Sequence, residues 1–85
     1  MQFPQFRRYN DGNTYFKIID SSNFLEHKRI GNVFTVIEIK CKLYPEKMFL
    51  NDLLISSFEH VEKIDELIYE TEIQNWAQKL KQFLI

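Results

Sequence analysis

Cys41 is the only cysteine in this 85-residue chain, and cysteine is the residue type best suited to nucleophilic chemistry. It lies between Lys40 and Lys42, and neighbouring cations lower the pKa of a thiol and favour the reactive thiolate. The surrounding stretch, however, alternates between two faces. One face carries Val33, Thr35, Ile37, Ile39, Cys41 and Leu43, and the other carries Glu38, Lys40 and Lys42. Cys41 is therefore expected to point into the core, where burial raises the thiol pKa, so we predict a packing role.

The other residues that could do chemistry are too scattered to form a catalytic or metal-binding site. His60 has Glu59 and Glu62 beside it, but the only other histidine, His27, belongs to a different segment. The serines lie in pairs whose context is typical of turns and helix caps. With two glycines nineteen residues apart, no glycine-rich phosphate loop can form. We therefore predict no enzyme activity, no catalytic residue, no metal, no cofactor and no small-molecule substrate.

A cluster of aromatic and basic residues near the start of the chain is the best candidate for a binding site. It consists of Phe6, Arg7, Arg8 and Tyr9, a mixture of cations and rings that can hold phosphates and stack on bases. With Lys40 and Lys42 it would make a basic and aromatic sheet face for a nucleic acid. The alternative interpretation is a strand whose charges discourage aggregation. The net charge of −1 and the pI of about 6.1 disfavour the nucleic-acid interpretation.

Turn signals divide the first half of the chain into strands. Asp11-Gly12 and Gly31-Asn32 each separate two apolar segments and predict tight hairpins. Residues 23–30 fit a strand or a short helix, and the strand is favoured because seven or eight residues make a marginal helix. Tyr44-Pro45-Glu46-Lys47 is expected to form a turn that ends the strand over 33–43. We expect a short strand over 48–50, then a short helical turn and loop over 51–63, where Ser56 and Glu59 have capping-box spacing.

The last part of the chain predicts an amphipathic helix that begins at a cap residue, Asp65. Its inner face follows helical spacing and consists of Tyr69, Ile73, Trp76, Leu80 and Phe83, widened by Ala77 and Leu84. Acidic residues lie early and lysines late, which suits the helix dipole. Such a helix would cover one face of the sheet.

These elements predict one α+β domain over residues 1–85, an antiparallel β-meander of four to five strands packed against one C-terminal α-helix. No signal peptide or membrane span is recognised, so a soluble cytoplasmic protein without membrane contact is expected. The predicted function is a non-enzymatic protein-interaction module, with a homodimer as the simplest assembly. Two features would bring copies together: the first strand, as an open sheet edge, and the helix end with Phe83 and Leu84.

Overall fold

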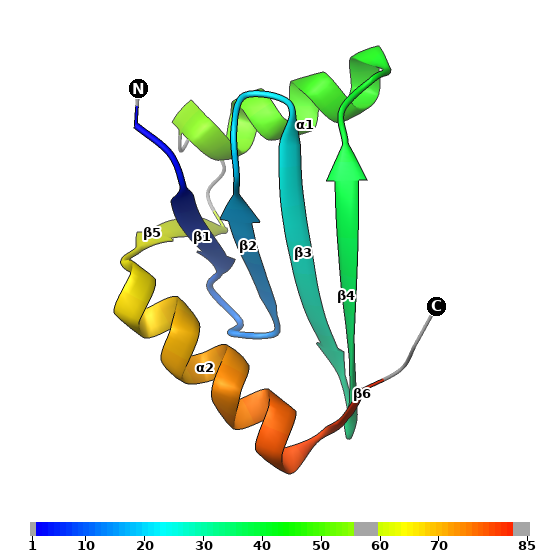
Figure 1. Ribbon diagram of the computed structural model, residues 1–85, viewed down its shortest axis with the longest axis vertical. Coiled ribbons are helices and arrows are strands. Elements are labelled where there is room, and N and C mark those ends of the chain that lie inside the picture. The colour runs from blue at the N-terminus through cyan, green and yellow to red at the C-terminus, as the bar shows by residue number, and fades with distance from the viewer. Residues whose placement is uncertain (1, 56–59, 83–85) are drawn as a thin grey trace.

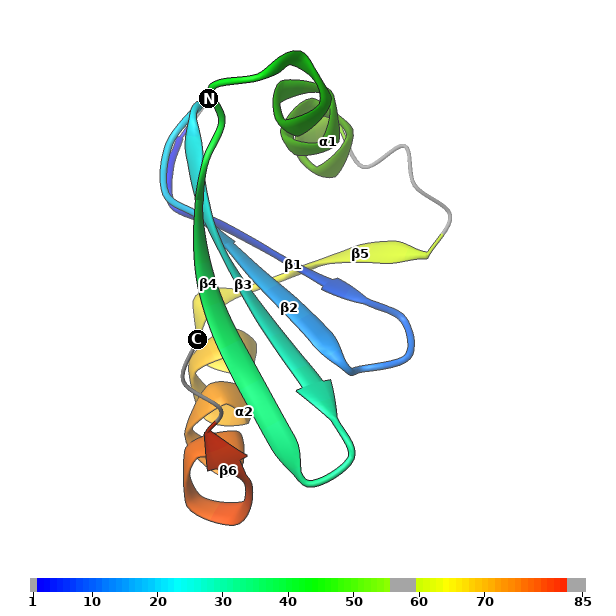
Figure 2. The ribbon, with the colours of Figure 1, turned by 90° about the vertical axis from the view of Figure 1, so that its right-hand side faces the viewer.

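The computed structural model describes residues 2–55 and 60–82 as a sheet with one helix on each face (Figures 1 and 2). The elements follow in the order β1 (Gln5–Tyr9), β2 (Thr14–Ile18), β3 (Asn23–Ile30), β4 (Val33–Lys40), α1 (Tyr44–Ile55), β5 (Val61–Ile64), α2 (Glu66–Lys79) and β6 (Lys81–Gln82). The strand order is β5-β1-β2-β3-β4-β6, and among these described strands the β4–β6 pair alone is parallel. The predicted α+β class is confirmed, with six strands in place of four to five and a second helix.

Strands β1 to β4 form the predicted meander, because both hairpin turns have the glycine that they require. Gly12 and Gly31 have φ values of 74° and 61°, a region that side chains with a Cβ rarely adopt. Residues 23–30 are a strand paired along its whole length with β4, from Asn23 opposite Lys40 to Ile30 opposite Val33. The preference for a strand over a short helix is confirmed there.

Helix α2 begins as predicted, since the Ile68 N–H donates to the Asp65 side chain at 2.8 Å. Tyr69 and Trp76 are buried against the sheet, and Ile73 and Leu80 pack beside them. The expectation that Ala77 widens this inner face is wrong, because Ala77 is exposed. The helix ends at Lys79, and Phe83 and Leu84 lie outside the described residues.

Helix α1 corrects the largest error of the sequence-based prediction. Residues 44–47 are not a turn, and residues 48–50 are not a strand; both belong to one helix. Pro45 is tolerated because the first helical turn has no backbone acceptor for its missing N–H. Glu46 then accepts from the Leu43 and Lys42 N–H groups at 3.1 and 3.3 Å, which closes the N-terminus. Within the expected short helical turn and loop over 51–63, residues 51–55 complete α1 and residues 61–63 belong to β5, while Ser56 and Glu59 lie outside the described residues.

Each face of the sheet is covered by a helix. Because successive strand residues point to opposite faces, they pack in two different hydrophobic clusters. Under α1 lies a cluster of Phe16, Ile18, Phe24, Cys41, Leu50, Leu53 and Val61. Under α2 lies a second cluster of Phe6, Tyr15, Phe34, Tyr69 and Trp76. The prediction of a single covered face is wrong, because it placed the core on only one side of the 33–43 strand, whereas Phe34 is buried on the other.

Cys41 is buried, as predicted, and its burial raises the pKa of its thiol. Leu43, expected beside it in the core, is exposed, because the strand ends at Lys40 before the chain turns into α1. The first strand is not a sheet edge either. β1 lies between β5 and β2, which contradicts the route to self-association through that strand.

Candidate functional site

The four residues of the basic and aromatic cluster do not share one surface. Because strand side chains alternate, Phe6 and Arg8 lie on the α2 side of the sheet, while Arg7 and Tyr9 lie on the α1 side. Phe6 packs on Tyr69 with ring centroids 4.9 Å apart, and Tyr9 packs on Phe16 at 5.3 Å. The Phe6 ring therefore packs in the cluster under α2, and the Tyr9 ring packs against the cluster under α1.

Arg7 is buried, and its guanidinium holds the end of α1. Its Nε donates to the Leu53 carbonyl at 3.0 Å and its Nη2 to the Leu54 carbonyl at 3.3 Å. The remaining donors bind the Phe6 carbonyl at 2.9 Å and the Gln5 side chain at 2.7 Å. Helix α1 has no basic residue in its last turn, so Arg7 supplies the positive charge that its carbonyl end favours.

Arg8 forms an ion pair with Glu62 of β5, the strand that lies beside β1. The hydrogen bond to Glu62 is the main reason why the Arg8 pKa is raised. Both side chains are partly exposed, so this pair contributes little to stability. It does occupy the guanidinium that the nucleic-acid hypothesis needs.

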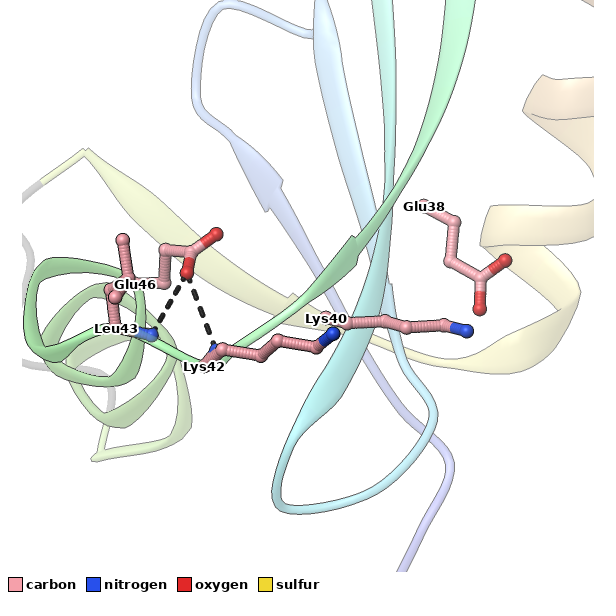
Figure 3. A pocket seen from close by; sticks show the side chains of 5 residues that line it. All are labelled: Glu38, Lys40, Lys42, Leu43 and Glu46. Carbon is pink, nitrogen blue, oxygen red and sulfur yellow. Dashed lines mark hydrogen bonds between the residues drawn. The ribbon is translucent and has the colours of Figure 1, made fainter.

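Lys40 and Lys42 lie at the opposite edge of the meander, around the N-terminus of α1. Together with Glu38, Leu43 and Glu46 they line an open hollow of about 560 Å³ (Figure 3). Both lysine side chains point away from Glu46 and toward the Glu38 end of the hollow (Figure 3). The positive charges of the two lysines equal the negative charges of Glu38 and Glu46. The hollow therefore has no net positive charge that would attract an anion.

A buried polar pair on the α2 side was not foreseen from the sequence. Tyr69 Oη and His27 Nε2 lie 2.5 Å apart, and the rings meet edge to face. Burial, together with the positive charge of Lys17, lowers the His27 pKa to about 4, and burial raises the Tyr69 pKa to about 12. His27 is therefore neutral at pH 7, enclosed, and suited to a structural role.

The outer face of α1 carries three exposed large apolar side chains. Tyr44, Met48, Asn51 and Ile55, which we call the outer α1 stripe, recur every three or four residues and so lie on one side of the helix. Tyr44 is 73 % exposed, Met48 48 % and Ile55 58 %. Leu50 and Leu53, on the opposite side, are fully buried. This stripe was not predicted from the sequence, because Pro45 indicated a turn. The available signal was that residues 44–55, placed on a helix, carry apolar residues on two opposite faces.

Residues 2–55 and 60–82 contain no group of three or more His, Cys, Asp or Glu side chains that could hold a metal ion. Within the same ranges no helix has both the length and the apolar character needed to cross a membrane.

The comparisons with known proteins do not place this chain in a family. No family model matches it, and neither a curated protein nor a solved structure is detectably similar to it. Function must therefore be argued from the surface itself.

Proposed function

We propose that this chain is a non-enzymatic, cytoplasmic protein-binding domain and that the outer α1 stripe is its contact surface. The observation that carries the proposal is that α1 is apolar on two opposite sides. A helix that is apolar all round is normally covered all round. Here the sheet covers only one side, through Leu50 and Leu53.

The size of the exposed patch supports this proposal. Taking about 200 Å² for a large, fully exposed side chain, Tyr44, Met48 and Ile55 expose about 350 Å² in one strip. Single exposed apolar residues are ordinary, but contiguous apolar patches of about 300–600 Å² are often functional. Tyr and Met are also among the residues enriched at protein interfaces.

The absence of catalysis remains part of the proposal and is supported by the state of the two best reactive side chains. Cys41 is buried with a raised thiol pKa, which is the reverse of an activated nucleophile. His27 is buried against Tyr69 and has a pKa far below the operating range of a general base at pH 7.

A nucleic-acid interface through Arg7, Arg8, Tyr9, Lys40 and Lys42 is the weaker proposal. Its guanidiniums are occupied by the end of α1 and by Glu62. The two lysines lie at β4, separated from β1 by two strands. Phosphate binding needs accessible cations that face one way, and these do not.

Photo-crosslinking in the cells that make the protein tests the proposed surface. One variant carries a photoreactive amino acid in place of Met48, and the control carries it in place of Gln74, an exposed residue of α2. We expect a discrete protein adduct from position 48 and none from position 74. No adduct at position 48, or equal adducts at both positions, would show that the outer α1 stripe is not the contact surface.

A further inference from the structure

We propose that the partner of the outer α1 stripe is the same stripe of a second copy, with the two α1 helices running parallel about a two-fold axis. This inference rests on the proposed function and adds the identity and orientation of the partner. It is carried by the residue spacing along the helix, by the charges that flank the stripe, and by the size of the exposed area.

The spacing of the stripe is that of a coiled-coil seam. Tyr44, Met48, Asn51 and Ile55 are separated by steps of four, three and four residues, as are the alternating d and a positions of a heptad repeat. Met48 and Ile55 take a positions, and Tyr44 and Asn51 take d positions. Side chains at this spacing fit between those of a similar helix, so a second α1 is a complementary occupant.

The charged residues that flank the stripe select the parallel orientation. Lys47 takes the g position and Asp52 the e position that follows it, five residues later. In a parallel pair, each g residue lies beside the following e residue of the other helix, so Lys47 of each copy would meet Asp52 of the other. An antiparallel pair would instead gather both lysines on one side and both aspartates on the other.

These two side chains are available for such contacts. The ion pair recorded within residues 2–55 and 60–82 joins Arg8 and Glu62, and it involves neither Lys47 nor Asp52. Lys47 is exposed, and Asp52 is partly exposed beside the stripe. Asn51 would face its counterpart across the axis, where the two side-chain amides can hydrogen-bond to each other.

The exposed area predicts a weak dimer. About 350 Å² of apolar surface per copy is roughly half of the ~800 Å² that each partner contributes to a standard interface. Three helical turns cannot supply a tight coiled coil either. The monomer and dimer should therefore exchange, with the dimer populated at high protein concentration.

Sedimentation of the purified protein between about 10 µM and 1 mM tests self-pairing. We expect the mass to rise from the 10.4 kDa of the monomer toward twice that value. Lys47→Glu and Asp52→Lys should each weaken the dimer about tenfold, because each variant replaces two attractive contacts with repulsive ones. The double variant, with both charges exchanged, should restore it. Loss without restoration would refute the assigned contacts.

Disulfide formation tests the orientation. Ile55→Cys should cross-link to itself on oxidation, because the two copies of position 55 face each other in a parallel pair. The parent, with its single buried Cys41, is the control. Cross-linking only in a mixture of Tyr44→Cys and Ile55→Cys proteins would prove an antiparallel pair and overturn the proposal.

A parent that stays monomeric at about 1 mM would also overturn self-pairing. It would leave the proposed function standing if position 48 still gives an adduct with a different protein in cells. The two ideas therefore fail on different results.

Discussion

At the scale of single residues, Arg7 and Arg8 show how position in a strand decides the role of a side chain. They are adjacent in the sequence and identical in chemistry, but they point to opposite faces of the sheet. Arg7 binds the last carbonyls of α1 in a buried setting, whereas Arg8 forms a partly exposed ion pair with Glu62. The buried contacts should matter far more to stability than the exposed pair.

A matched pair of variants measures this difference. Arg7→Met should lower the free energy of unfolding by about 2–4 kcal/mol, because it leaves the Leu53 and Leu54 carbonyls without their donors. Arg8→Met should cost less than about 1 kcal/mol. Urea denaturation of both proteins gives the values. Equal losses in the two variants would mean that Arg7 does not hold the end of α1.

His27 should make stability depend on pH. Its pKa is lowered from 6.5 to about 4 in the folded protein, so between these values the unfolded chain binds a proton that the folded chain does not. The free energy of unfolding therefore has its full value, as far as His27 is concerned, above pH 6.5. It falls as the pH is lowered toward 4, by about 3 kcal/mol in total. Thermal or urea unfolding from pH 7 to pH 4 measures the loss.

The control for this prediction is His27→Gln, whose amide can accept from the Tyr69 hydroxyl but does not titrate. Protonation of the carboxylates affects both proteins alike, so the difference between parent and variant isolates the histidine. Parallel pH profiles would contradict a neutral, buried His27.

At the scale of elements, α1 has one side that belongs to the fold and another that does not. Met48→Gln with Ile55→Gln should leave the free energy of unfolding of the monomer within about 0.5 kcal/mol of the parent, since both residues are on the exposed side. Leu53→Ala, on the buried side of the same helix, should cost about 2–5 kcal/mol. Chemical denaturation at low protein concentration compares them. A large loss in the glutamine variant would mean that the stripe is part of the core.

Elements defined by local signals could be predicted from the sequence. The two hairpins follow from Asp11-Gly12 and Gly31-Asn32, and the start of α2 follows from Asp65, because each depends on residues within a few positions. Strand β3 could be chosen over a helix because the strand that it pairs with comes directly after the turn.

What the sequence could not predict depends on contacts between distant segments. Pro45 is typical of both a turn and a first helical turn, and only the packing of Leu50 and Leu53 on the sheet distinguishes the two. Burial of both sheet faces blurs the alternation on which the strand prediction relied. The place of β1 inside the sheet follows from pairing with β5, more than fifty residues later in the chain, and no local signal reports it.

At the scale of the whole molecule, the distribution of charge predicts poor binding to nucleic acids. The net charge is −1, and the arginines of the first strand are engaged within the fold. We expect a labelled single-stranded oligonucleotide to show no binding at protein concentrations up to about 100 µM in low salt. Fluorescence anisotropy is the measurement. Salt-dependent binding that is lost in a Lys40→Gln, Lys42→Gln variant would revive the nucleic-acid hypothesis.

The central claim is that two copies of this protein meet through the outer α1 stripe. Amide NMR spectra of the purified parent, recorded at increasing concentration, test it most directly because they locate any contact along the chain. We predict that the shifts which change with concentration cluster at Tyr44, Met48, Asn51 and Ile55, and that the amides of Glu66–Lys79 in α2 stay constant. Changes that cluster on α2 or along β5, with α1 unaffected, would contradict the claim.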